Sequence, residues 1–161
     1  MINKKLFSLM STVIVSTLLL SGCVNKPDKP TVAAPEETSF TGVKSVELPY
    51  DKTGKSKDVI VTDVTFKDGK PTDVNIDVKT EDGTIKSKLS ADGGYIMKEG
   101  ETNAWHEQID LLEKGIKDNN FDLSKIPLID DDGHIDAVTS VSIKVSTYLD
   151  SVQNALDEVN K

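Results

Sequence analysis

Residues 58–78, DVIVTDVTFKDGKPTDVNIDV, carry the pattern that decides the fold. Residues 58–66 are rich in β-branched side chains and predict a strand, and KDGKP at 67–71 predicts a turn. In residues 73–78 polar and apolar side chains alternate strictly, so that one face of a second strand carries Asp73, Asn75 and Asp77 and the other carries Val74, Ile76 and Val78. The stretch therefore predicts an antiparallel hairpin with one wet face and one covered face.

Segments on either side of this hairpin extend the sheet and cover it. Residues 43–50 predict a short strand that Pro49 ends. Downstream, Thr102 is a candidate N-cap of a helix that stops at residues 118–120, and a second helix is predicted from about Val141. Each helix has one apolar stripe at spacings of three and four, formed by Trp105, Ile109, Leu112 and Ile116 in the first and by Val145, Tyr148, Val152, Leu156 and Val159 in the second. Strands followed by helices predict an α+β domain, a small antiparallel sheet covered by two helices.

The composition narrows the classes of function. The 161 residues include 19 basic and 27 acidic side chains, a net charge of −8, and all 19 basic ones are lysines. An acidic chain without arginine lacks the basic surface that binds DNA or RNA, so we expect no nucleic-acid partner. The single cysteine excludes an internal disulfide and any site that needs several thiolates.

The first 23 residues have the pattern of an export signal that ends in a lipid anchor. Two lysines precede an apolar stretch from Leu6 to Leu20, and residues 1–22 contain no acid, as in a signal peptide. The end of this segment, Leu20-Ser21-Gly22-Cys23, resembles the lipobox of bacterial lipoproteins. In that family a diacylglyceryl group is attached to the cysteine and the chain is cut before it, which implies that Cys23 is the lipidated N-terminus. An ordinary signal peptide with a chance cysteine is the alternative.

The mature protein then consists of a tether and one domain. Residues 23–39 contain three of the six prolines and almost no large apolar side chain, which is typical of a semi-extended linker. Loss of residues 1–22 removes two of the 19 lysines and no acid, leaving 17 basic against 27 acidic residues and a charge of −10. Such a surface repels anionic headgroups, so we expect the lipid on Cys23 to hold the domain, residues 40–161, at the bilayer.

Residues 136–142, DAVTSVS, form the segment that gives the most information about a binding site. Small hydroxylated residues where a loop becomes a helix leave backbone N–H groups free, and phosphate binds readily to such groups. The other interpretation is that Thr139 or Ser140 only caps the last helix. The residue types alone leave both interpretations open.

The same segment resembles the flavinylation motif of FMN-binding domains: Asp, two variable residues, Ser or Thr, a small residue, Ala and Thr. Such domains occur in sodium-pumping quinone reductases, in Rnf-type electron-transport complexes and in lipoproteins of extracellular electron transfer. There a flavin transferase joins FMN through its phosphate to the last hydroxyl. The resemblance implies that Ser142 is the acceptor, that Asp136 and Thr139 shape its turn, and that the last helix begins at the phosphate. Ser140 matches the small residue, whereas Val141 replaces the Ala and Ser142 replaces the Thr.

The resemblance extends upstream, over about residues 58–150. The segments DGGYIM at 92–97 and AWHEQ at 104–108 are similar to those of flavin-binding lipoproteins from Gram-positive bacteria. The candidates for contact with the flavin ring are Tyr95, Met97 and Trp105. For the tryptophan, its place on the apolar stripe of its helix also predicts a core side chain.

The resemblance implies a membrane-anchored electron carrier with covalent FMN, and not an enzyme with a substrate of its own. It would relay electrons at the outer face of the cytoplasmic membrane, from a donor such as a quinone-linked dehydrogenase. Its partners would be the flavin transferase, that donor and the bilayer. Two alternatives stay open. One is a lipoprotein with the same fold but no flavin, acting as a binding or surface-antigen module. The other concerns residues 15–22, VSTLLLSG, which could be released as a peptide pheromone.

Three other kinds of site fail on spacing. The segment HEQID at 106–110 lacks the second histidine of a zinc-protease helix. The run DDDG at 130–133 would need an acidic residue where Leu128 stands to be a calcium loop. No nucleophile elbow surrounds Ser142. The sequence therefore predicts neither a metal site nor hydrolase activity.

Overall fold

The computed structural model describes residues 39–97 and 103–159 and contains one antiparallel sheet in the order β1-β2-β3. Strand β1 spans Gly42–Pro49, β2 spans Val59–Lys67 and β3 spans Lys70–Lys79. The two residues between β2 and β3, Asp68 and Gly69, have φ values of 51° and 72°, the left-handed conformation of a tight hairpin turn. The predicted hairpin and its preceding strand are confirmed.

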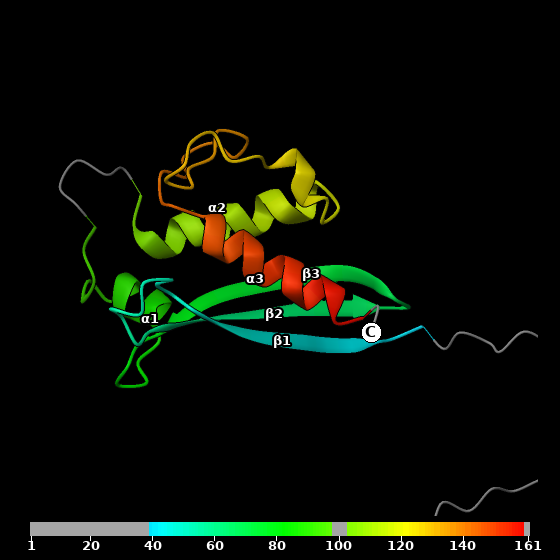
Figure 1. The fold of residues 1–161 in the computed structure, drawn as a ribbon, viewed down its shortest axis with the longest axis horizontal. Helices are drawn as coiled ribbons and strands as arrows, with labels where there is room; N and C mark the ends of the chain where they lie inside the picture. Colours follow the sequence, from blue (N-terminus) through cyan, green and yellow to red (C-terminus); the bar gives the residue numbers. More distant parts are fainter. Residues whose placement is uncertain (1–38, 98–102, 160–161) are drawn as a thin grey trace, which may run out of the picture. The chain divides into compact units, whose positions relative to one another are not determined.

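Two long helices cover one face of this sheet (Figure 1). Helix α2, Trp105–Asp118, packs mainly on β3, and α3, Ser146–Asp157, packs on β1 and β2. A short helix α1, Lys86–Ala91, follows the sheet, and a 3-10 turn, η1, covers Leu123–Lys125. The connection between α2 and α3 passes over the outside of α2 (Figure 1). The predicted α+β class, a small antiparallel sheet covered by two helices, is confirmed.

The core lies between the sheet and the two helices. Strand β3 buries its three apolar side chains, while Asp73 and Asn75 are exposed, as the alternation predicted. Both predicted helical stripes face inward. The buried apolar side chains of the two helices are Trp105, Ile109, Leu112, Ile116, Tyr148, Leu149, Val152 and Ala155. The segment that precedes α3 is joined to α2 and to the segment before α2 by hydrogen bonds, from the N–H of Ser142 to Gln108 and from the Asn103 side chain to the carbonyl of Ser140, and the candidate site lies there.

The last helix begins at Ser146, so the predicted start at Val141 is wrong. The backbone N–H groups of Ser142 and Ile143 donate to the side chain of Gln108, which holds this stretch against α2. In a helix that began at Val141, the N–H of Val145 would donate to the carbonyl of Val141. The N–H of Val145 donates to the carbonyl of Gly133 at 2.7 Å. Long-range hydrogen bonds thus hold this segment as a loop although its valines have helical spacing.

Several predictions concern residues that the structure does not describe. Residues 1–22, the lipidated Cys23, nearly all of the tether at 23–39 and the candidate N-cap Thr102 lie outside the described ranges. They stay predictions. Within residues 39–97 and 103–159, no helix is long and apolar enough to cross a bilayer.

Glu113 joins α2 to strand β3 and makes the stability of the fold depend on pH. Its carboxyl group accepts a hydrogen bond from the N–H of Ile76 at 2.6 Å. Burial, opposed by this hydrogen bond, raises the pKa of Glu113 from 4.5 to about 7. The folded protein therefore binds more protons than the unfolded chain between these pH values. The contribution of Glu113 to stability is fully present below pH 4.5 and is lost as the pH rises through 7.

Replacing Glu113 with glutamine is expected to remove this pH dependence. Glutamine keeps an oxygen that can accept the hydrogen bond from Ile76 but carries no charge. Because the side chain is partly exposed, we expect the variant to match the parent protein near pH 4.5 and to be about 1–2 kcal/mol more stable near pH 8. Urea unfolding of both proteins at the two pH values measures the difference. A difference that does not change with pH would contradict burial of this carboxylate.

Candidate functional site

The segment that resembles the flavinylation motif is a loop lying on α2. Asp136, Thr139, Ser140 and Ser142 are all exposed on it. Ser140 has a φ of 67°, in the left-handed region where large side chains are disfavoured, which explains why a small residue stands there. The four predicted residues of the motif thus lie on the surface within residues 136–142, and this stretch ends four residues before α3 begins.

Valine side chains attach this loop to the domain. Val138 packs against Gly115 of α2 so closely that a Cβ atom on the glycine would lie 2.5 Å from a Val138 methyl carbon. Val141 is only 6% exposed and belongs to the core. The bulk of Val141 therefore points inward, away from the exposed residues Ser140 and Ser142 that flank it.

A buried amide fixes the backbone at Ser142. Gln108 of α2 is 1% exposed. Its Oε1 accepts hydrogen bonds from the N–H of Ser142 at 2.7 Å, from the N–H of Ile143 at 3.1 Å and from the Ser142 hydroxyl at 3.2 Å. Its Nε2 donates to the carbonyl of Asn103 at 3.1 Å and to the Sδ atom of Met97 at 3.4 Å. We call this arrangement the Gln108 clamp; it brings Ser142 and Met97, two predicted site residues, to one side chain.

A buried lysine of α1, Lys86, lies among aromatic rings. One of these rings is Trp105, about one turn of α2 before Gln108. Lys86 is 7% exposed, and its Nζ lies 4.8 Å, 4.3 Å and 4.8 Å from the ring centroids of Tyr50, Tyr95 and Trp105. The ammonium donates a hydrogen bond to the hydroxyl of Tyr50 at 3.3 Å. These four residues form what we call the Lys86 cage. Trp105 is 2% exposed and packs at 6.4 Å from Tyr148, so its prediction as a core side chain is confirmed.

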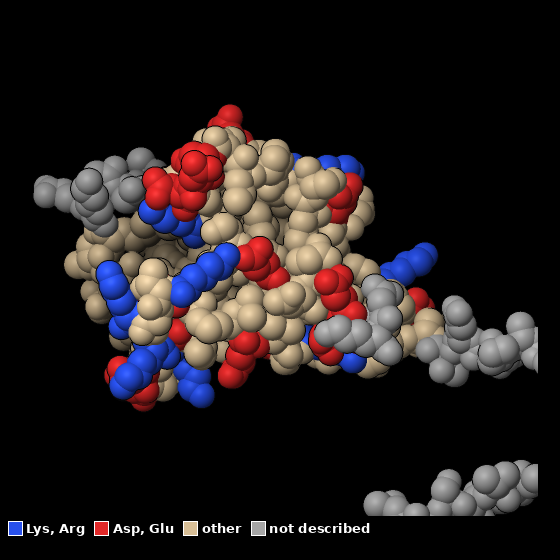
Figure 2. Space-filling view, viewed as in Figure 1, with Lys and Arg blue, Asp and Glu red and all other residues tan. Residues whose placement is uncertain are grey.

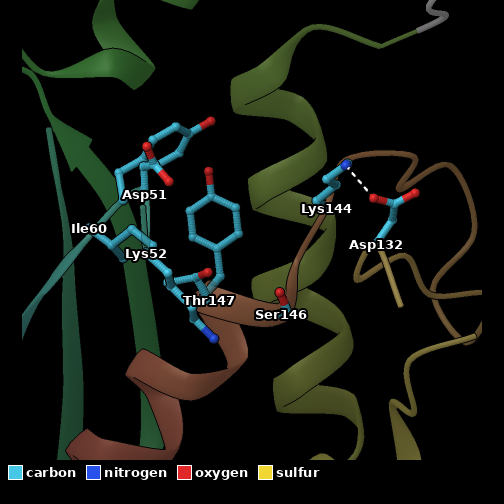
Figure 3. A pocket seen from close by; sticks show the side chains of 9 residues that line it. Asp51, Lys52, Ile60, Asp132, Lys144, Ser146 and Thr147 are labelled. Carbon is cyan, nitrogen blue, oxygen red and sulfur yellow. Dashed lines mark hydrogen bonds and ion pairs between the residues drawn. The ribbon is translucent and has the colours of Figure 1, made fainter. Parts of the chain in front are cut away.

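A cavity of about 330 Å³ lies between the β1–β2 connection and the start of α3. Figure 3 shows Lys52 and Ile60 on its sheet side, Ser146 and Thr147 at the start of α3, and Lys144 paired with Asp132. Tyr50 and Tyr148 complete its wall. Figure 2 shows this face of the molecule hollowed there, with basic side chains above and below the hollow in that view. Tyr50 belongs to both this cavity and the Lys86 cage.

Two lysine–carboxylate pairs lie at the rim of the cavity, and Asp51, also in its lining, accepts hydrogen bonds from Thr53 and from the N–H of Lys55. Lys52 contacts Asp150 at 2.8 Å, and Lys144 contacts Asp132 at 2.7 Å. Both pairs are exposed, so each contributes little and is weakened by salt. Burial raises the pKa of Tyr148, which keeps its phenol protonated in the wall. The cavity thus has charged groups of both signs at its rim, and the Lys86 ammonium lies behind the wall formed by Tyr50.

Three residues of this region were not predicted from the sequence: Gln108, Lys86 and Tyr50. For the glutamine a signal existed, since residue 108 is three positions after Trp105 and four before Leu112, on the apolar side of the helix. A polar residue on a buried face indicates a hydrogen-bonding role. The lysine stands in the polar segment KSKLS, which gives no signal of burial.

The arrangement offers three chemical features. Ser142 presents an exposed hydroxyl on a fixed backbone, the cavity begins two residues further along at Lys144, and the cage places a positive charge among flat rings. Together these features suit a ligand with a phosphate at one end and a ring system at the other.

Comparisons with known proteins support the fold. No protein-family model matches the chain, and no curated protein matches it. The chain is similar to a protein from Clostridium thermocellum whose solution NMR structure was determined by the Northeast Structural Genomics Consortium. The two are 30% identical in sequence with a TM-score of 0.54, over 75% of this chain and 92% of the other. With this identity and coverage, the chain belongs to the same family as that Clostridium thermocellum protein.

Proposed function

We propose that this chain is a membrane-anchored flavoprotein that carries FMN on Ser142 and relays electrons at the outer face of the cytoplasmic membrane. The observation that carries the proposal is the Gln108 clamp, which fixes the backbone of an exposed serine at the acceptor position of a flavinylation-like motif. A transferase needs such an acceptor to be both accessible and held in one geometry.

Two observations at Ser142 support an FMN phosphoester there. The hydroxyl is on the surface, and the departure from the motif at Val141 does not crowd it, because that side chain is buried. In the transfer, Ser142 Oγ would form the new bond to the phosphorus of an activated flavin nucleotide. The serine proton would leave to a base of the transferase as the anhydride bond to the departing nucleotide breaks. Bound FMN would supply transfer of one or two electrons.

The proposed location follows from the N-terminal pattern, and the negative charge means that the lipid must hold the protein there. Lipid on Cys23 would hold a mature chain of charge −10 at a bilayer that otherwise repels it. A covalent bond suits an exported protein, since a dissociable cofactor would be diluted outside the cell. The partners are then the flavin transferase, a membrane electron donor such as a quinone-linked dehydrogenase, and the lipid bilayer.

Co-expression of the full-length chain with a flavin transferase tests the proposal. We expect a yellow protein whose mass increases by one FMN phosphoester, with the increment on the peptide that contains Ser142. As a control, a protein that the transferase is known to flavinylate is expressed in the same cells to show that the transferase is active. A chain of unchanged mass beside a modified control substrate would refute covalent flavinylation and would favour the alternative, a lipoprotein of the same fold that acts as a binding or surface-antigen module.

A further inference from the structure

We propose that the Lys86 cage is the site of the flavin ring system, with the Lys86 ammonium facing the carbonyl oxygens of the ring; this inference rests on the proposed function. The class of ligand is a flat heteroaromatic ring that bears oxygen acceptors and gains negative charge on reduction. Positive charge close to such a ring is one of the means by which a protein tunes a flavin.

The first argument concerns the charge on Lys86. None of the ion pairs among the described residues includes it, whereas Lys52 and Lys144 at the cavity rim each contact a carboxylate. Burial of an ammonium group without a counter-charge is costly, and cation–π contacts with three rings offset part of that cost. A ligand that brought negative charge or carbonyl oxygens to Lys86 would compensate it further.

The second argument concerns hydrogen-bonding capacity. An ammonium group has three N–H donors. One of them reaches the hydroxyl of Tyr50 at 3.3 Å, a long contact, and the group otherwise lies over ring faces. Among the described residues, no other hydrogen bond from Lys86 is present. The group therefore retains donors for the oxygen acceptors of a ligand.

The third argument concerns the distance from the proposed attachment point. Trp105 of the cage and Gln108 of the clamp are three residues apart on α2, a rise of about 4.5 Å along the axis. The cavity lies next to both: Lys144 in its lining is two residues from Ser142, a span of at most about 7 Å, and Tyr50 is shared with the cage. A phosphate on Ser142 and a ring at Lys86 are thus within reach of one flavin nucleotide.

The fourth argument concerns access. Tyr95 is the outer wall of the cage and is 36% exposed, and its neighbour Ile96 is 85% exposed. These two apolar side chains lie in the loop after α1 and not in a helix or strand. A flat ring that took the place of the exposed Tyr95 ring would lie over the Lys86 ammonium without disturbing the core.

The single tryptophan of the chain makes the test direct, because Trp105 lies in the cage. Riboflavin lacks the phosphate and cannot be attached to Ser142, so its titration into the full-length, unmodified protein in detergent reports on the ring site alone. We expect saturable quenching of tryptophan emission. Lys86→Met should weaken binding by about tenfold or more and Lys86→Arg by less, whereas Lys88→Met, an exposed lysine on the same helix, should change nothing.

One further variant completes the experiment. Tyr95→Ala removes the exposed ring that covers Lys86, so it should strengthen riboflavin binding, and it provides a test even if Lys86→Met does not fold. Absence of quenching, or equal affinity in the parent, Lys86→Met and Tyr95→Ala proteins, would overturn the inference while covalent FMN on Ser142 could still be found. Riboflavin binding that depends on Lys86, in a chain that no transferase modifies, would support the ring site and refute covalent attachment.

Discussion

Ser142→Ala is expected to abolish covalent incorporation of FMN while the fold stays intact. The variant lacks the only side-chain oxygen at the acceptor position, so no phosphoester can form there. The loss of the long hydroxyl contact to Gln108 leaves both backbone hydrogen bonds of the clamp in place. Because Ser142 is exposed, we expect the free energy of unfolding to change by less than about 0.5 kcal/mol. Intact mass after co-expression with the transferase, together with urea unfolding, measures both effects.

Two matched variants show whether the loss is specific to Ser142. Ser140→Ala makes the same chemical change on the same exposed loop and should still be flavinylated. Ser142→Thr restores the residue that the motif has in FMN-binding domains and should also be flavinylated. Covalent flavin on the Ser142→Ala protein would show that another hydroxyl, such as that of Thr139, is the acceptor.

The parts of the fold that could be predicted are those in which local pattern and burial agree. In β3 the alternation of polar and apolar side chains matches a sheet with one covered face, and Asp68-Gly69 is a residue pair that favours a tight hairpin turn. The apolar stripes predicted both long helices because each stripe packs on the same sheet. The periodicity of apolar residues is enough to predict a helix or strand where one face of it packs on a flat layer.

The start of α3 was predicted wrongly because a hydrogen bond to another part of the loop decides it. Residues 141, 145 and 148 have helical spacing and all are buried, yet Val141 enters the core from a loop. A sequence pattern reports which residues are buried but not which acceptor their backbone N–H groups find. Here the N–H of Val145 donates to the carbonyl of Gly133, 12 residues earlier in the sequence, and not to the carbonyl of Val141.

The cage was missed for a related reason. Lys86 and Lys88 look alike in the sequence, and only the packing of α1 beside α2 buries the first and exposes the second. The three rings around Lys86 come from three separate segments, at Tyr50, Tyr95 and Trp105. No local pattern connects them. By contrast, the motif at 136–142 was visible because its residues are contiguous, although its placement at the helix start was wrong.

Gln108→Leu is expected to release the acceptor loop and to destabilise the domain by about 2–4 kcal/mol. Leucine has a similar size but neither accepts nor donates hydrogen bonds. The change removes three bonds to Oε1 and two from Nε2, and the carbonyl of Asn103 loses its donor in a partly buried position. We expect urea unfolding to show the loss of stability. Gln153→Leu, the same change at an exposed glutamine of α3, should have little effect.

Amide hydrogen exchange distinguishes release of the loop from general destabilisation. If the clamp holds the acceptor, the N–H groups of Ser142 and Ile143 lose their protection in Gln108→Leu by a larger factor than the amides of β2, which report global unfolding. Flavin incorporation should fall together with the protection of these two N–H groups, because a mobile serine spends less time in the geometry that the transferase needs for attachment of FMN. If these two amides keep their protection relative to β2, the clamp does not order the loop. In that case the rigidity of the acceptor must come from the packing of Val138 and Val141 on α2 and the core.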